Sequence, residues 1–226
     1  MLRYISWLLS FIYPVYCLGC QKEGIWLCSY CQNNQINYNT HQICPISLKK
    51  SIKGKVLQAY KNKICLDSLI VLAPYNKNNL LQKLLKHLKY FFAFDIAFIF
   101  GNLLKTLLKK EKIKINEFTI TSVPLYWKRQ LWRGFNQSEL IAKNLGKTTK
   151  LLKRIKNTKQ QAKLKEKERY KNMKNSFQFI SSTIPEQVLL IDDVASTGAT
   201  LNECAKILKK AGVKTVVACV IARNIL

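Results

Sequence analysis

VLLIDDVASTGATL, residues 188–201, joins an apolar run to two adjacent acids and then to a loop of small and hydroxyl residues. The apolar run predicts a buried strand that ends at Asp192 and Asp193. An apolar stripe at helical spacing begins at Leu201, so the loop leads directly into a helix. We therefore expect a strand, a short loop and a helix, with both carboxylates at the carboxyl end of the strand.

This arrangement suits a sugar phosphate. Free backbone N–H groups and the helix dipole at a helix N-terminus favour a phosphate, and Gly198 lets the backbone approach a ligand closely. The carboxylates of Asp192 and Asp193 can accept hydrogen bonds from the vicinal hydroxyls of a ribose. The residues expected to form the phosphate cradle are Ala195, Ser196, Thr197, Gly198, Ala199 and Thr200. An ordinary strand-to-helix connection, in which an aspartate caps the helix, is the alternative.

Several other kinds of site are excluded by the pattern. No G-K-[ST] follows Gly198, so the loop is not a Walker loop, and it is not a G-x-G-x-x-G dinucleotide turn. The two histidines, His41 and His87, are isolated and do not support a Ser/His or Cys/His nucleophile.

The rest of the second half alternates between strand and helix patterns, which predicts an α/β domain with a largely parallel sheet. We expect strands at 119–123, 176–180, 187–191 and 215–222, and helices at 137–145 and 201–211. Leucine and phenylalanine at helical spacing predict two earlier helices, within 80–88 and 96–107, that cover one face of the sheet.

Composition indicates a folded, strongly basic protein. The chain has 226 residues, 48% of them hydrophobic, and a formal charge of +26 from 38 basic and 12 acidic residues. Such a charge attracts polyanions, although the abundance of Lys, Asn and Ile also fits AT-rich coding. Only six basic residues are arginine, and lysine cannot replace its planar fork at a phosphate. Four of the six fall in one stretch: Arg129, Arg133, Arg154 and Arg169.

Residues 1–70 are rich in cysteine and have little periodicity, so we expect a small module there and a second domain at 71–226. The segments CLGC and CSYC form two C-x2-C knuckles, which place Cys17, Cys20, Cys28 and Cys31 as ligands of a structural zinc ion. A redox role is the alternative for these thiols. Cys44 and Cys65 are too few for a second cage and fit small buried hydrophobes better.

The sequence gives only weak indications of a signal peptide or of a membrane span. The apolar start of the chain lacks a small-residue cleavage site and is shorter than the roughly 20 residues that span a bilayer. The apolar segment 91–108 is interrupted by Asp95, Asn102 and Lys105, which favours a buried helix. We expect a cytoplasmic protein with no integral membrane span, and peripheral attachment at the inner face of the membrane as the alternative.

The segment I-D-D-V-A-S-T-G-A-T closely resembles the phosphoribosyl pyrophosphate (PRPP) motif of type I phosphoribosyltransferases, with Ser196 where threonine is commoner. Further segments resemble one branch, the ComF family of competence proteins, which includes GntX-like proteins. They are V-P-L at 123–125, R-G-F-N-Q-S at 133–138, the cysteine knuckles, and Thr158, Gln161, Leu164, Arg169, Asn172 and Phe177. The resemblance covers most of the chain.

The resemblance implies a type I phosphoribosyltransferase fold that binds PRPP with Mg2+. Asp192 and Asp193 would hold the ribose hydroxyls, and Arg129 and Arg133 would lie near the leaving pyrophosphate, with Asp192, Asp193 and Arg133 as the catalytic set. Arg154, Thr158, Gln161 and Arg169 would belong to a hood that excludes water.

Two functions stay open. The chain either transfers a phosphoribosyl group from PRPP to an unidentified acceptor, or it is a non-catalytic competence factor whose PRPP pocket is regulatory or vestigial. In the second case the basic surface binds single-stranded DNA. That surface would include Lys159, Lys163, Lys165 and Lys167. The family's link to natural transformation also implies a DNA-uptake helicase or channel as a partner.

Overall fold

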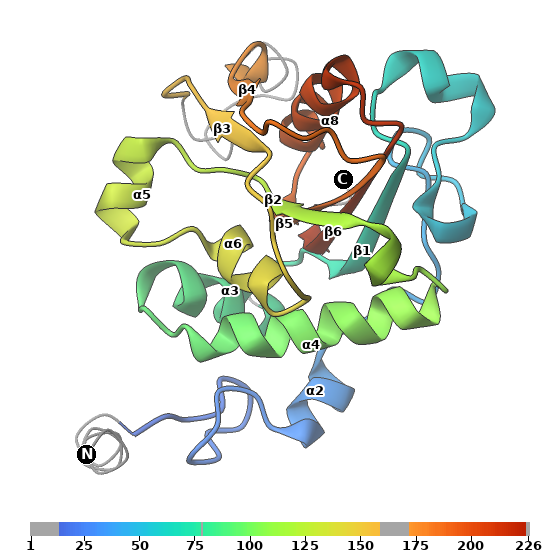
Figure 1. The fold of residues 1–226 in the computed structure, drawn as a ribbon. Coiled ribbons are helices and arrows are strands. Elements are labelled where there is room, and N and C mark those ends of the chain that lie inside the picture. The colour runs from blue at the N-terminus through green and yellow to red at the C-terminus, as the bar shows by residue number, and fades with distance from the viewer. Residues whose placement is uncertain (1–13, 78, 159–171, 225–226) are drawn as a thin grey trace.

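A four-stranded parallel sheet forms the centre of the protein in the computed structural model, which describes residues 14–77, 79–158 and 172–224 (Figure 1). The strand order is β1-β6-β5-β2. The strands are β1 (Ser68–Pro74), β2 (Thr119–Ser122), β5 (Gln187–Ala195) and β6 (Thr215–Arg223). The expected α/β class with a parallel sheet is confirmed, and the helix and strand patterns of the second half lie where the sequence predicts them, within a few residues.

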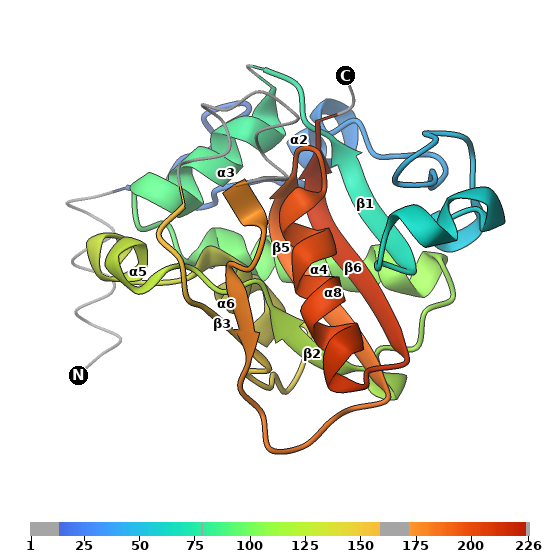
Figure 2. The ribbon, with the colours of Figure 1, turned by 90° about the horizontal axis from the view of Figure 1, so that it is seen from above.

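Helices cover both faces of this sheet. Strand side chains on one face of the sheet, such as Ile70, Leu189 and Cys219, pack in a cluster with three helices: α3 (Leu80–Tyr90), α4 (Asp95–Lys110) and α6 (Gln137–Lys143). Strand side chains on the other face, such as Leu190 and Val220, pack against α8 (Ala199–Ala211). Figure 2 shows α8 over one face and α4 behind the other. The predicted pair of helices on one face, α3 and α4, is confirmed.

Close packing of α4 against α6 depends on Gly101. A Cβ atom at this position would lie 2.3 Å from the Cβ of Asn144, so a larger residue would force the two helices apart. On its other side, α6 contacts β2 and β5.

A small antiparallel ribbon lies beside the main sheet. It pairs β3 (Leu152–Arg154) with β4 (Phe177–Phe179). The strand predicted at 176–180 therefore exists, but it belongs to this ribbon and not to the parallel sheet, because its partner is the preceding segment. A short helix not expected from the sequence, α5 (Trp127–Arg133), follows β2.

The first part of the described N-terminal segment packs onto α3 and α4, and a later part lies beside β1. It contains α2 (Ser29–Gln35) and the short 3-10 helices η1 (Ile52–Gly54) and η2 (Gln58–Lys63), while a third, η3 (Ile115–Glu117), precedes β2. Leu27 and Ile36 join the same buried cluster as α3 and α4. The boundary expected at residue 70 falls inside β1. In the part of the chain that is described, no helix is both long and apolar enough to cross a membrane.

Candidate functional site

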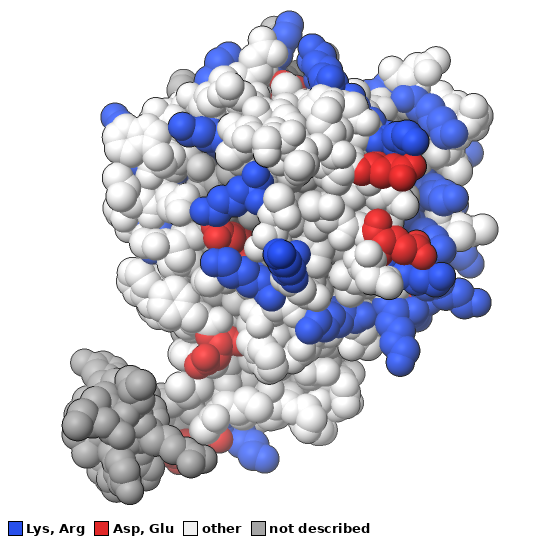
Figure 3. Space-filling model, viewed as in Figure 1, with Lys and Arg blue, Asp and Glu red and all other residues white. Residues whose placement is uncertain are grey.

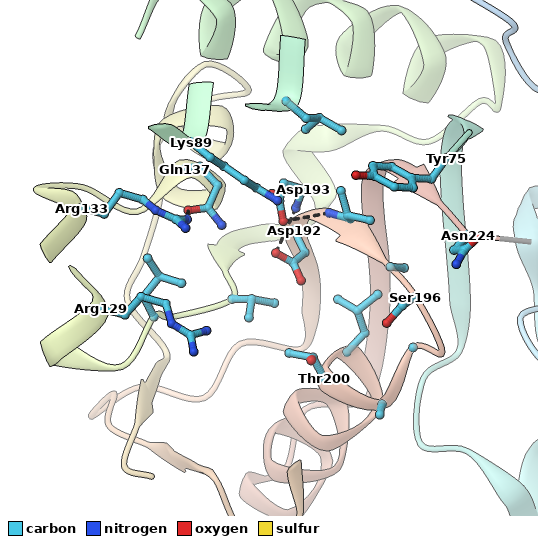
Figure 4. A pocket seen from close by; sticks show the side chains of 18 of the residues that line it. Tyr75, Lys89, Arg129, Arg133, Gln137, Asp192, Asp193, Ser196, Thr200 and Asn224 are labelled. Atoms are coloured by element: carbon cyan, nitrogen blue, oxygen red, sulfur yellow. Dashed lines mark hydrogen bonds and ion pairs between the residues drawn. The ribbon is translucent and has the colours of Figure 1, made fainter. Parts of the chain in front are cut away.

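A cavity of about 490 Å³ lies at the carboxyl ends of the strands, between the loops that follow β2 and β5 (Figure 4). The two strands are neighbours in the sheet, but their loops lead to opposite faces. The loop after β2 leads through α5 to α6, and the loop after β5 leads to α8. A point where neighbouring connections diverge in this way opens a crevice, and it is where open parallel sheets bind their ligands.

The two acids form one wall of this cavity. Strand β5 continues to Ala195, so Asp192 and Asp193 lie within the strand and not after its last residue as expected. They are only 9% and 5% exposed. Ser138 Oγ donates a hydrogen bond to Asp192 Oδ1 at 2.8 Å, and the ammonium of Lys89 forms an ion pair with Asp193.

Burial and the neighbouring charge shift the ionisation of this pair. Burial is the main cause that raises the pKa of Asp192, to about 7, and the charge of Asp193 adds to it. The hydrogen bond from Ser138 and the charge of Lys89 oppose this rise only in part. For Lys89, burial acts to lower the pKa, but the attraction of Asp193 outweighs it and the pKa is raised. Among the described residues, the acid pair is therefore contacted by one ammonium group, Lys89, and by the hydroxyl of Ser138.

Three arginines form the opposite wall: Arg129 and Arg133 from α5, and Arg154 from β3. Arg133 is 8% exposed, and its Nη1 donates to Gln137 Oε1 at 2.6 Å. The Nε atoms of Arg133 and Arg154 are buried and have no hydrogen-bond partner among the described residues. A buried donor without a partner costs about 1–3 kcal/mol, and a ligand with acceptor oxygens at this wall would remove that cost.

The loop after β5 supplies the third wall. Ala195, Ser196, Gly198, Ala199 and Thr200 line the cavity, whereas Thr197 does not. Instead, Thr197 Oγ1 accepts a hydrogen bond from the backbone N–H of Ala199 at 3.4 Å. Gly198, the N-cap residue of α8, has φ +77°, a left-handed conformation that glycine adopts without strain, and it has no side chain that could cap the helix. The N-terminus of α8 therefore faces the cavity.

The structure adds residues that the sequence analysis missed. Lys89 of α3, Tyr75 directly after β1 and Asn224 directly after β6 also line the cavity. One feature of the sequence could have identified Lys89 as a site residue: it follows Leu85 by four residues, so it lies on the buried stripe of α3. Ser138 lies at the end of the R-G-F-N-Q-S segment, and its hydrogen bond to Asp192 shows its place in the site.

The expected hood is described only in part. Arg154 Nη2 donates to Thr158 Oγ1, and Arg129 Nη2 donates to the backbone oxygen of Thr158 at 3.4 Å. Thr158 thus connects two cavity arginines. The remaining residues predicted for the hood and for the DNA surface lie outside the described residues: Gln161, Arg169, Lys159, Lys163, Lys165 and Lys167.

A second site is formed by Cys17, Cys20, Cys28 and Cys31, whose sulfur atoms all lie within 4.8 Å of one another. The sulfurs of Cys20 and Cys28 are 3.6 Å apart, close to the roughly 3.8 Å that separates two thiolates on tetrahedral zinc. Burial acts to raise the pKa of the Cys17 thiol, but hydrogen bonds from the backbone N–H groups of Cys28, Cys20 and Gly19 lower it to about 6. Four convergent thiols, one of them readily ionised, can hold zinc.

Comparisons with known proteins agree with this geometry. Residues 133–225 match the phosphoribosyl transferase domain, which places the cavity within a protein of that fold. The chain is 31% identical to Competence protein F of Haemophilus influenzae over 215 residues, 88% of this chain and 86% of the relative. The chain belongs to the ComF family.

Two further relatives align over shorter regions. Competence protein ComFC of Streptococcus pneumoniae is 34% identical over 136 residues, 55% of this chain and 57% of the relative. DNA utilization protein YhgH of Escherichia coli K12 is 35% identical over 104 residues, 43% of this chain and 45% of the relative.

Proposed function

We propose that this ComF-family protein binds PRPP together with Mg2+ in the cavity between β2 and β5, and that it acts in DNA uptake during natural transformation. The observation that carries the first part is the arrangement of two buried carboxylates opposite three arginines, with an open helix N-terminus between them. The names of its relatives, which refer to competence and DNA utilization, support the second part.

Each wall of the cavity suits one part of PRPP. Asp192 and Asp193 accept hydrogen bonds from the ribose hydroxyls, and the N-terminus of α8 with Ser196 and Thr200 receives the 5-phosphate. Arg129 and Arg133 bind the diphosphate, where the Nε–H of Arg133, which has no partner among the described residues, gains an acceptor. The carboxylate oxygens of Asp192 and Asp193 are also the kind of hard donor that Mg2+ prefers.

We infer that the same groups support phosphoribosyl transfer when an acceptor is present. Breaking the bond between the anomeric carbon and the diphosphate puts negative charge on the departing oxygens, which Arg129 and Arg133 stabilise. Mg2+ would supply further neutralisation of the diphosphate. The acids stabilise the positive charge that develops on the sugar, and Arg154 with Thr158 limits the access of water from the side of the ribbon.

Thermal unfolding with and without ligand tests this proposal. PRPP with Mg2+ at about 100 times its dissociation constant should stabilise the protein by about 2.7 kcal/mol and raise its melting temperature. Asp192→Asn with Asp193→Asn should abolish the rise. Glu186→Gln, which neutralises an exposed acid at the other end of β5, is the matched control and should retain it. If the unmodified protein shows no rise, PRPP binding is excluded.

A second candidate function is single-stranded DNA binding by a non-catalytic factor, with the PRPP pocket regulatory or vestigial. The charge of +26 favours it. Neutralising Lys159, Lys163, Lys165 and Lys167 together should weaken DNA binding and reduce its salt dependence. Unchanged affinity would exclude these lysines as the DNA surface. In this function a DNA-uptake helicase or channel is the expected partner.

We further propose that residues 1–70 act as a zinc-stabilised module beside the domain formed by 71–226. For the location we propose the cytoplasm, with the protein attached peripherally at the inner face of the membrane. The high positive charge is attracted to anionic lipid headgroups, at about 1 kcal/mol for each lysine near the surface.

A further inference from the structure

Eight large apolar side chains are exposed on one side of the protein and form what we call the aromatic patch. They come from the end of α3, the α3–α4 connection, the first turn of α4, and α5. Each is between 49% and 73% exposed: Tyr90, Phe91, Phe92, Phe94, Phe98, Trp127, Leu131 and Trp132. Folded proteins rarely leave so many large apolar side chains together in water, and such patches usually mark an interaction site.

Ring contacts connect the members of the patch across elements that are distant in sequence. Tyr90 at the end of α3 meets Trp132 of α5, with ring centroids 6.4 Å apart. Phe135, which follows α5, lies 4.9 Å from Phe94 and 6.2 Å from Phe92. Both ribbon views show α5 beside α3, and Figure 3 shows this side, at its left margin, as largely free of charge. These contacts bring the end of α3 and the α3–α4 connection together with α5 on one side of the protein.

The backbone adopts an unfavourable conformation at one residue of this surface. Phe92 follows the C-cap of α3 with φ +55°, the left-handed conformation that usually selects glycine at the end of a helix. A bulky side chain is unfavourable in that conformation. The Phe92 side chain is nevertheless 59% exposed, so the fold gains little from burying it.

The shape of the patch favours a membrane over other partners. Neither of two cavities in the described part of the protein contains the patch as a whole: one is lined by Tyr90 alone among these eight residues, and the other by none of them. Three ring pairs meet edge to face, with interplanar angles of 64° to 79°, and Phe91 stacks on His87 within the protein. This arrangement differs from a row of parallel ring faces on which successive bases stack. Protruding Phe, Trp and Leu side chains are those that enter the boundary between headgroups and acyl chains.

Cations lie at the edge of the patch. Lys128 is exposed and its ammonium lies 5.4 Å from the centre of the Trp127 ring, and Lys86 is exposed on α3. We propose that the aromatic patch inserts into the interfacial layer of a membrane that contains anionic lipids, with Lys86 and Lys128 at the headgroups. This inference builds on the peripheral attachment proposed above and assigns it to one surface.

The attachment would fix the orientation of the candidate active site. Tyr90 belongs both to the aromatic patch and to the cavity lining, and the guanidinium of Arg133 lies 5.5 Å from the centre of its ring. The cavity would therefore open beside the membrane surface, with its arginines near the headgroups.

The tryptophans provide a direct test in the full-length protein. Two of the four, Trp127 and Trp132, lie in the patch, so Trp7→Phe with Trp26→Phe leaves only these two tryptophans, whose emission can be excited selectively over that of tyrosine. Vesicles containing phosphatidylglycerol should shift their emission to shorter wavelength, and brominated acyl chains should quench it. Vesicles of phosphatidylcholine alone should bind more weakly, because they lack the negative charge.

A patch variant with Phe91→Ser, Leu131→Ser and Trp132→Ser should lower vesicle binding at least about tenfold. The control removes equally exposed apolar residues elsewhere, with Tyr30→Ser, Ile52→Ser and Ile184→Ser, and should bind as the unmodified protein does. Unchanged binding of the patch variant would overturn the inference and place the anchor elsewhere, such as in residues 1–13. Fluorescence that responds to a single-stranded oligonucleotide but not to vesicles would also overturn it.

The same variants separate this inference from the proposed function. The stabilisation by PRPP with Mg2+ should persist in the patch variant, because none of its three changes alters a cavity residue. Loss of that stabilisation only in the variants of Asp192 and Asp193 would uphold PRPP binding whatever the vesicle experiment shows.

Discussion

The ammonium of Lys89, at the end of α3, pairs with the carboxylate of Asp193, near the end of β5. The Lys89 side chain is 21% exposed and that of Asp193 is 7% exposed, so the pair is largely shielded from water. Asp192 lies next to it in the strand, which leaves two carboxylates and one cation in a small volume. Without ligand, Lys89 therefore balances the charge of the wall that we propose to bind ribose.

Replacing Lys89 with methionine should destabilise the fold. Methionine preserves most of the side-chain volume but leaves the buried acids without their cation, a situation that costs about 3–5 kcal/mol in fully buried pairs and about 2–3 here because Lys89 is partly exposed. Denaturant unfolding would measure the loss. Lys86→Met, on the same helix but without an acidic partner among the described residues, should change stability little. Equal effects of the two substitutions would contradict the pairing.

Stability should rise as the pH falls from 8 to 5. The pKa of Asp192 is about 7 in the folded protein, whereas it is about 4 in an unfolded chain, so the folded state binds more protons across this window. The free energy of unfolding should therefore increase on acidification, and Asp192→Asn should reduce that increase. Urea unfolding at several pH values would test this, with Glu186→Gln as a control. An identical pH profile for Asp192→Asn would exclude Asp192 as the titrating group.

Most regular elements could be predicted because their apolar patterns are local. The stripes of α3 and α4 and the apolar runs of β5 and β6 follow from spacing alone. The three-residue strand β3 is too short for a pattern, and α5 carries its apolar side chains on an exposed surface, so neither resembles a buried element. The pairing of β4 with β3, and not with the main sheet, depends on contacts between segments that sequence patterns do not specify.

The candidate site likewise contains some residues that the sequence predicts and others that it does not. Asp192, Asp193 and the loop to Thr200 lie within one continuous segment, so their common location was predictable. Lys89 reaches them only because α3 packs on the face of the sheet toward which Asp193 points. Distant segments that meet through tertiary packing leave only weak traces in the sequence, such as a lysine within an apolar stripe.

The cysteine cluster should contain about one zinc ion per chain. Cys28→Ser removes a buried ligand and should lower both the zinc content and the melting temperature, because a structural zinc site contributes folding free energy. Cys65→Ser changes a cysteine outside the cluster and should retain the metal. Elemental analysis and calorimetry would measure both effects. Purified protein that lacks metal and keeps its stability under chelation would refute the zinc site.

The close packing of α4 on α6 predicts a loss of stability when Gly101 is replaced by a larger residue. Gly101→Ala places a Cβ 2.3 Å from that of Asn144 and should destabilise the fold by about 1–3 kcal/mol through overpacking. Adding Asn144→Gly removes the opposing Cβ, so the double variant should recover part of the loss relative to the sum of the two single changes. Strict additivity in denaturant unfolding would show that the two residues do not clash.

PRPP binding should require the guanidinium group of Arg133 and not only its positive charge. Arg133→Lys keeps the charge but loses the planar fork and the contact with Gln137, so PRPP affinity should fall about tenfold or more. Lys128→Gln removes a charge from the same helix outside the cavity and should leave the affinity nearly unchanged. Titration calorimetry at one fixed salt concentration would compare the three proteins. If Lys128→Gln weakens binding as much as Arg133→Lys does, general attraction by the basic surface explains the affinity, and Arg133 does not contact the diphosphate.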